Sequence, residues 1–258
     1  MEIRLLGPVE AWCDGVRLNL GPRQQRFALA VLALETNRLV SVDRLVDLTW
    51  PSLPPRTARH AIQVSISRLR TVLAAAGTGG AVQLVTEGCG YVLRLNPLNV
   101  DAHHFRALIE QARCYALDAD KVSLLRRALR LWRGPALANA GAPEVADQLT
   151  RGLTEDRLAA EEECLDAELR IGNHLAVLGA LVDLVAQHPY RQRFAAQLMI
   201  AQYRAGRPAD ALATYRTARA ALVRDLGLDP ERRLRDLAGA IVRGDPWLDL
   251  PATAGSAG

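Results

Sequence analysis

The pattern of the chain changes at Asn96-Pro97, and this change limits the folds it can adopt. Before this point, short strand-like segments alternate with helical ones; from Asp101 onward, almost every segment is rich in Ala, Leu, Arg and Glu and has helical periodicity. The sequence therefore predicts a mainly helical protein with an α+β part at 1–97 and an all-helical part at 98–250. Residues 251–258 are small and polar, and we expect a frayed tail there.

The first part has a recognisable order of elements. Asp14-Gly15 favours a two-residue hairpin turn, and Glu87-Gly88-Cys89-Gly90 favours a second tight turn. Between these turns, three prolines in Trp50–Pro55 interrupt the helical pattern. The expected elements are strands at 2–6, 10–13 and 16–20, helices at 23–37, 42–49 and 56–75, and strands at 82–86 and 91–95. Strands, three helices and a final hairpin are the layout of a winged helix-turn-helix.

The third expected helix is amphipathic. Its apolar residues are spaced four, four, three and four apart, which forms one stripe for burial: Ala58, Ile62, Ile66, Leu69 and Leu73. The other side carries Gln63, Val64, Ser67, Arg68 and Arg70. In a major groove, Gln can pair with adenine, Val can contact a thymine methyl group, and Arg can pair with guanine or with phosphate. This side therefore has the chemistry of a DNA-reading surface.

Positive charge is concentrated in the first part of the chain. The net charge is +4, and residues 1–97 contain 11 Arg against 7 acids, so they account for all of it. From Pro54 to Val72 there are four arginines and His60 but no acid. Such a cluster is typical of a phosphate-binding surface, although an ordinary solvated helix face has the same composition.

The second part contains an internal sequence repeat. Arg170-Ile171-Gly172 and Arg204-Ala205-Gly206 are 34 residues apart, as are Leu178 and Leu212. A period of 34 residues in paired helices is typical of tetratricopeptide-like repeats.

Several other functions find no support in the sequence. No apolar run reaches the roughly 18 residues of a membrane span, and the N-terminus lacks a signal peptide, so we expect a cytoplasmic protein. The four cysteines are far apart, and His103-His104 lacks acidic or cysteine partners at ligand spacing. With no nucleophile–base pair and no phosphate-binding glycine loop, we expect no enzyme, no metal and no cofactor.

Longer motifs carry a family resemblance over nearly the whole chain. Residues 63–70, with Gly88-Cys89-Gly90-Tyr91, resemble the OmpR/PhoB-type winged helix. The remainder resembles the bacterial transcriptional activation domain. The stretches that carry this second resemblance are Val100-Asp101-Ala102, 128–137, His188-Pro189, 203–207 and 225–230. Together they are similar to the Streptomyces antibiotic regulatory protein family in its short form.

That resemblance implies a transcriptional activator of a secondary-metabolite gene cluster. It implies binding to tandem direct repeats about one helical turn apart, as a homodimer on the DNA, and recruitment of RNA polymerase. The DNA-binding residues it indicates are Arg56, Arg59, His60, Gln63, Val64, Ser67, Arg68, Arg70, Thr86 and Tyr91. The polymerase-contacting loop it indicates contains Trp50, Ser52, Leu53 and Pro54.

Two alternatives and one departure accompany this interpretation. The chain could be an interaction scaffold whose first part contacts protein, or a regulator gated by a small molecule in the repeat groove. The departure is Glu87, an acid at a hairpin position that is often basic in winged helices. A carboxylate beside a phosphate repels it, so Glu87 opposes close contact between the hairpin and DNA.

Overall fold

The computed structural model describes residues 1–77 and 80–250, so the tail expected at 251–258 lies outside the described residues. The chain forms two compact units. The first contains residues 1–114 with 126–158, and the second contains 115–125 with the residues from 159 onward. The domain boundary expected after residue 97 falls inside the first unit. The division of the chain into regions 1–97 and 98–250 stays a prediction.

A small antiparallel sheet begins the first unit. Strand β1 (Glu2–Arg4) pairs with β2 (Glu10–Cys13), and β2 pairs with β3 (Val16–Arg17). Asp14 and Gly15 connect β2 to β3 with φ angles of 50° and 80°, as the hairpin prediction requires. The third strand is shorter than expected, because ladder pairing ends at Arg17.

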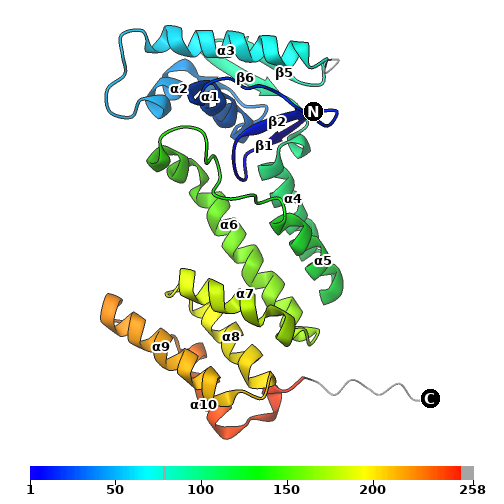
Figure 1. Ribbon diagram of the computed structural model, residues 1–258, viewed down its shortest axis with the longest axis vertical. Helices are drawn as coiled ribbons and strands as arrows, with labels where there is room; N and C mark the ends of the chain where they lie inside the picture. The colour runs from blue at the N-terminus through cyan, green and yellow to red at the C-terminus, as the bar shows by residue number, and fades with distance from the viewer. Residues whose placement is uncertain (78–79, 251–258) are drawn as a thin grey trace, which may run out of the picture. The chain divides into compact units, whose positions relative to one another are not determined.

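Three helices build the core beside this sheet (Figure 1). They are α1 (Arg23–Leu34), α2 (Val42–Thr49) and α3 (Ala58–Ala75). Ser41 caps α2 by accepting a hydrogen bond of 3.1 Å from the Arg44 amide, as expected of a serine at this position. Helix α1 ends three residues earlier than predicted, because Asn37 adopts a left-handed φ of 63° and donates its amide to Leu93.

A second antiparallel sheet has the strand order β4-β6-β5. The predicted hairpin is β5 (Gln83–Glu87) with β6 (Gly90–Arg94), each shifted by one residue from expectation. Strand β4 (Val40–Ser41) joins it and was not predicted, because two residues carry no periodicity. Gly90 permits this pairing, since a Cβ atom there would lie 2.1 Å from the Val40 carbonyl oxygen.

Residues after the hairpin bind back onto β1 and its following loop. The 3₁₀ helix η1 (Pro97–Asn99) leads into α4 (Asp101–Arg113), where the buried Asp101 carboxylate accepts hydrogen bonds from the amides of Leu5 (2.6 Å) and Leu6 (3.1 Å). Arg133 donates its amide to the Leu6 carbonyl at 2.7 Å. These bonds explain why part of the predicted activation region packs in the first unit.

In the second unit, consecutive helices pack against one another: α8 contacts both α7 and α9. Helices α5 (Asp118–Leu129) and α6 (Pro143–Arg170) contribute residues to both units. The remaining elements are α7 (His174–Gln187), α8 (Gln192–Arg204), α9 (Pro208–Leu226), α10 (Arg232–Arg243) and the 3₁₀ helix η2 (Pro246–Leu248).

The internal sequence repeat lies where one helix ends and the next begins. Helix α6 ends at Arg170 and α8 at Arg204, while α7 begins at His174 and α9 at Pro208, so both pairs repeat after 34 residues. Gly172 and Gly206 have φ angles of 90° and 73° in the two turns. Each turn therefore needs the conformational freedom of glycine at the same repeat position.

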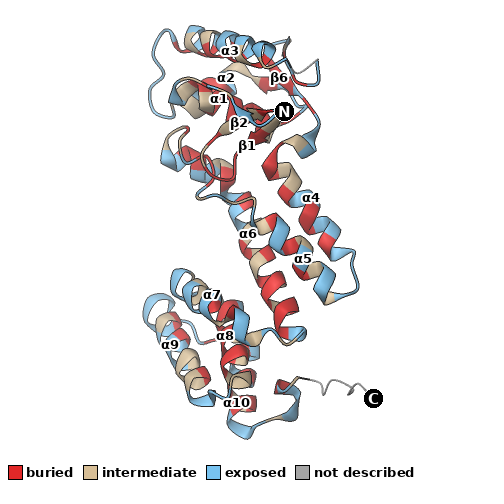
Figure 2. Cartoon of the chain, turned by 45° about the vertical axis from the view of Figure 1, so that its right-hand side comes forward, coloured by how far each residue is buried: buried red, intermediate tan, exposed pale blue. Residues whose placement is uncertain are grey.

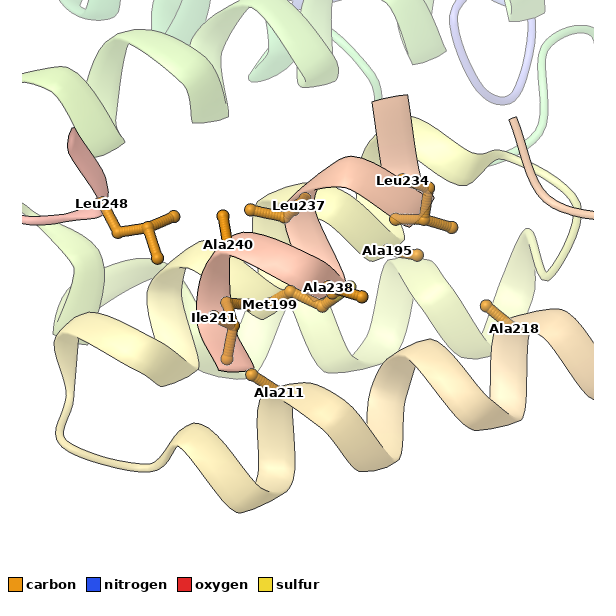
Figure 3. Packing of buried hydrophobic residues seen from close by; sticks show 10 residues of the cluster. All are labelled: Ala195, Met199, Ala211, Ala218, Leu234, Leu237, Ala238, Ala240, Ile241 and Leu248. Carbon is orange, nitrogen blue, oxygen red and sulfur yellow. The ribbon is translucent and has the colours of Figure 1, made fainter. Parts of the chain in front are cut away.

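Helices α8, α9 and α10 share one hydrophobic core (Figure 3). Met199 of α8 and Ile241 of α10 lie in it, and they are 0% and 4% exposed. Ala195, Ala211 and Ala218 provide small contact surfaces on α8 and α9, which lets α10 approach closely.

The coarse fold class is confirmed: residues 1–77 and 80–250 are mainly helical and include two small antiparallel sheets. Within residues 1–77 and 80–250, no helix combines the length and the apolar character needed to cross a bilayer.

Candidate nucleic-acid interface

Helix α3 has one buried side and one exposed side, as its spacing predicted. Ile62, Ile66 and Leu69 are each 0% exposed and pack inward. The exposed side appears as pale blue along the helix (Figure 2), and it carries Arg59, His60, Gln63, Ser67 and Arg68. Val64 is half-buried between the two sides, and Arg56 is exposed in the turn that precedes the helix. The structure thus brings these predicted residues together along one helix.

The electrostatics of this exposed side favour an anion. No acid occurs between residues 48 and 86. Within residues 1–77 and 80–250, the one carboxylate that pairs with an arginine of this side is Asp43 of α2, which forms an ion pair with Arg59. Arg68 has no ion-pair or hydrogen-bond partner anywhere in the described ranges, 1–77 and 80–250. Its guanidinium therefore keeps all its donors for an external group.

Arg70 has a different position from Arg68. Its Nε donates to the Leu84 carbonyl and its terminal nitrogen to the Thr86 hydroxyl, both at 2.7 Å. The guanidinium also lies 5.8 Å from the centre of the Tyr91 ring. Tyr91 itself is buried, at 7% exposed. Three predicted DNA contacts thus form an internal brace between α3 and the β5–β6 hairpin.

The hairpin also neutralises its acid. Glu87 of β5 forms an ion pair with Arg94 of β6, and both side chains are partly exposed. Sequence analysis identified the Glu87 carboxylate as an obstacle to phosphate but missed Arg94, because the pairing depends on the register of the two strands. Arg94 is therefore a cation on the hairpin whose charge is neutralised by Glu87.

The loop between α2 and α3 is non-helical and mostly exposed. Trp50 ends α2 by donating its amide to the Val46 carbonyl at 2.9 Å, and its side chain is half-buried. Ser52 and Pro54 are exposed, and Leu53 is 86% exposed. Leu53 is thus a single large apolar side chain exposed on a proline-rich loop.

Comparison with known proteins identifies the family. Residues 100–242 match the bacterial transcriptional activator domain. The regulatory protein DnrI of Streptomyces peucetius is 35% identical over 267 residues, which cover 98% of each chain. The transcriptional regulator RedD of Streptomyces coelicolor is 36% identical over 98% of this chain and 73% of its own. The chain belongs to the Streptomyces antibiotic regulatory protein family. It is a transcriptional activator, as the resemblance implied.

Members of this family differ in length. The chain spans 26% of the regulatory protein AfsR of Streptomyces griseus, at 37% identity over 98% of its own residues. A solved structure titled Mycobacterium tuberculosis EmbR in complex with low affinity phosphopeptide is 34% identical and superposes with a TM-score of 0.89. That superposition covers 95% of this chain and 65% of EmbR. The named relatives are all regulators, which agrees with the absence of an enzyme motif in the sequence.

Within the described ranges, the chain has neither a metal-binding cluster nor a disulfide. Residues 1–77 and 80–250 contain no group of three or more His, Cys, Asp and Glu side chains placed to hold a metal ion. All four cysteines lie within these ranges and none forms a disulfide; Cys13 and Cys164 are buried, and Cys89 and Cys114 are exposed.

Proposed function

We propose that this family member activates a secondary-metabolite gene cluster by inserting α3 into the major groove of promoter DNA. In this proposal residues 1–97 act as a winged helix-turn-helix, and residues 98–250 act as a tetratricopeptide-like activation region. The operator consists of tandem direct repeats, on which the protein acts as a homodimer in the cytoplasm.

The exposed side of α3 is the observation that carries this proposal. It combines an unpaired Arg68 with Gln63 and Ser67, and α3 itself contains no acid. Gln63, Val64 and Ser67 have the sizes and groups that contact base edges. Arg56, Arg59, His60 and Arg68 supply donors for phosphates at the sides of the groove. Arg70 and Tyr91 hold the hairpin in place, and Thr86 is exposed at the brace.

The test is a binding titration with promoter DNA from the neighbouring gene cluster, followed by footprinting. Arg68→Ala should weaken binding by about tenfold and lower the slope of log affinity against log salt by about one. Arg216→Ala is the matched control, because Arg216 is also an exposed helical arginine, on α9, and makes no bond within residues 1–77 and 80–250. Equal affinities for Arg68→Ala, Arg216→Ala and the unchanged protein would reject the DNA interface and favour the scaffold alternative.

We further propose that the loop at residues 50–55 contacts RNA polymerase. The exposed Leu53 side chain and the exposed Ser52 and Pro54 beside it support this. Leu53→Ser should reduce transcription in vitro several-fold without changing DNA affinity, since the loop lies outside α3. Leu39→Ser is the control, because Leu39 is another exposed leucine of the same unit, at 51%. Unchanged transcription with Leu53→Ser would refute the polymerase contact.

A further inference from the structure

A groove lies among α7, α8 and α9 in the second unit, and its lining contains none of the residues proposed to contact DNA or RNA polymerase. Its volume is about 530 Å³, within the range of roughly 300–1,000 Å³ that small-molecule sites occupy. The walls are mostly aliphatic and contain no aromatic side chain: Val182, Val185, Pro189, Leu198, Ala213 and Ala221 contribute to them. The groove is therefore large enough for an apolar molecule, and its chemistry suits one.

One buried polar side chain in this groove has unused hydrogen-bonding capacity. Gln202 of α8 is 8% exposed, and its Oε1 accepts a hydrogen bond of 2.9 Å from the Thr214 hydroxyl of α9. That bond orients the amide, so its Nε2 is left as the donor. No residue of the described ranges, 1–77 and 80–250, accepts from Nε2. Nε2 is not fully buried, so it is reachable from the groove and can donate to an acceptor on a bound molecule.

The charges at the groove cancel. Arg207 and Asp210 are the ionised side chains of the lining, and they pair with each other at 2.7 Å. An ionised ligand would have to disrupt this pair or remain unneutralised. An uncharged molecule enters without either cost.

We propose that the α7–α9 groove binds an uncharged, mainly apolar small molecule whose carbonyl oxygen accepts a hydrogen bond from Gln202. The aliphatic walls bury the hydrocarbon part, and the amide fixes its orientation. This site goes beyond the proposed DNA and polymerase contacts and depends on neither, because its residues belong only to α7, α8, α9 and the turns between them.

The probe is prodan, an uncharged naphthyl ketone whose fluorescence shifts to the blue in apolar surroundings. We expect saturable binding to the full chain, a blue shift, and displacement by the aliphatic ketone methyl nonyl ketone. Gln202→Met, which keeps the size of the side chain but removes the donor, should weaken binding by about tenfold. Binding that is absent, or that does not saturate, would overturn the proposal.

A matched pair of variants locates the site. Thr217 is exposed and lines the groove, so Thr217→Trp should fill it and abolish the blue shift without disturbing the core. Ala220 is exposed on the same helix but lies outside the lining, so Ala220→Trp should leave prodan affinity unchanged. Equal binding by both variants would show that prodan binds elsewhere and would also overturn the proposal. DNA affinity, measured separately, decides only the function proposed above.

Discussion

The guanidinium of Arg70 and the hydroxyl of Thr86 are joined by a hydrogen bond of 2.7 Å across 16 residues of sequence. This bond connects α3 to the β5–β6 hairpin, and a second bond from Arg70 to the Leu84 carbonyl reinforces it. Arg70, which the sequence placed beside Arg68 as a DNA contact, thus uses its Nε and one terminal nitrogen in bonds to the hairpin. Two neighbouring arginines of one helix therefore have separable roles.

The first prediction separates these roles by stability. Arg70→Ala should lower the free energy of unfolding by about 1 kcal/mol, because it removes two hydrogen bonds that are partly exposed to solvent. Arg68→Ala should leave stability within about 0.5 kcal/mol, since Arg68 has no bond within residues 1–77 and 80–250. Urea denaturation of both variants measures the difference. Equal destabilisation by the two would show that the brace contributes nothing.

The second prediction concerns the glycines of the hairpin. Gly90→Ala should destabilise the protein by about 3 kcal/mol or more, because its Cβ would overlap the Val40 carbonyl and separate β4 from β6. Gly88→Asn is the control: Gly88 has a φ of 49°, which Asn tolerates, and nothing lies within 4 Å of its added Cβ. Thermal melting of both variants tests this, and a Gly90→Ala variant as stable as Gly88→Asn would contradict it.

Helices were predictable from the sequence because their apolar spacing is periodic. The stripe from Ala58 to Leu73 predicted both ends of α3 to within two residues. The repeated segments at Arg170 and Arg204 predicted the 34-residue spacing between the ends of α6 and α8. Strand β4 escaped prediction because two residues contain no pattern, and it forms only through pairing with β6.

The candidate site was predictable as a helix face but not as a set of bonds. Gln63, Ser67 and Arg68 are exposed because the buried stripe fixes which side faces outward. The pairing of Glu87 with Arg94, and of Arg70 with Thr86, depends on tertiary register that composition does not contain. Likewise, the hydrogen bonds from Leu5 and Leu6 to Asp101, 96 and 95 positions later, have no local signal in the sequence.

The third prediction addresses that contact. Asp101→Ala leaves the buried amides of Leu5 and Leu6 without an acceptor, so it should cost about 2–4 kcal/mol. Asp101→Asn keeps one amide oxygen as an acceptor and should cost less. Chemical denaturation followed by far-ultraviolet circular dichroism measures both. A cost for Asp101→Ala below that of Asp101→Asn would contradict the role of the carboxylate.

The fourth prediction follows from the protonation of Asp101. Burial raises the pKa of this carboxyl, and the hydrogen bonds from Leu5 and Leu6 and the charge of Arg133, 3.5 Å away, only partly offset that effect. The folded protein therefore holds the proton more tightly than the unfolded chain. The resulting stabilisation is complete below the ordinary pKa of about 4 and is lost as the pH rises through the raised value.

Comparing the unchanged protein with Asp101→Asn isolates this titration from that of the other acids. The difference in their free energies of unfolding should shrink as the pH rises from about 4 toward neutrality. Denaturation curves at a series of pH values provide the measurement. A difference that grows with rising pH would mean that hydrogen bonds and Arg133 outweigh burial.

The fifth prediction tests whether the hairpin has a latent phosphate contact. Glu87→Gln removes the charge that neutralises Arg94 but keeps the shape of the side chain. The freed guanidinium should raise DNA affinity several-fold and steepen the salt dependence by about one counterion, because the proposed function places this hairpin near the DNA backbone. Glu35→Gln is the matched control: Glu35 pairs with Arg44 at 3.0 Å on the same unit, outside α3 and the hairpin. If both substitutions raised affinity equally, the gain would come from net charge alone and the hairpin would make no phosphate contact.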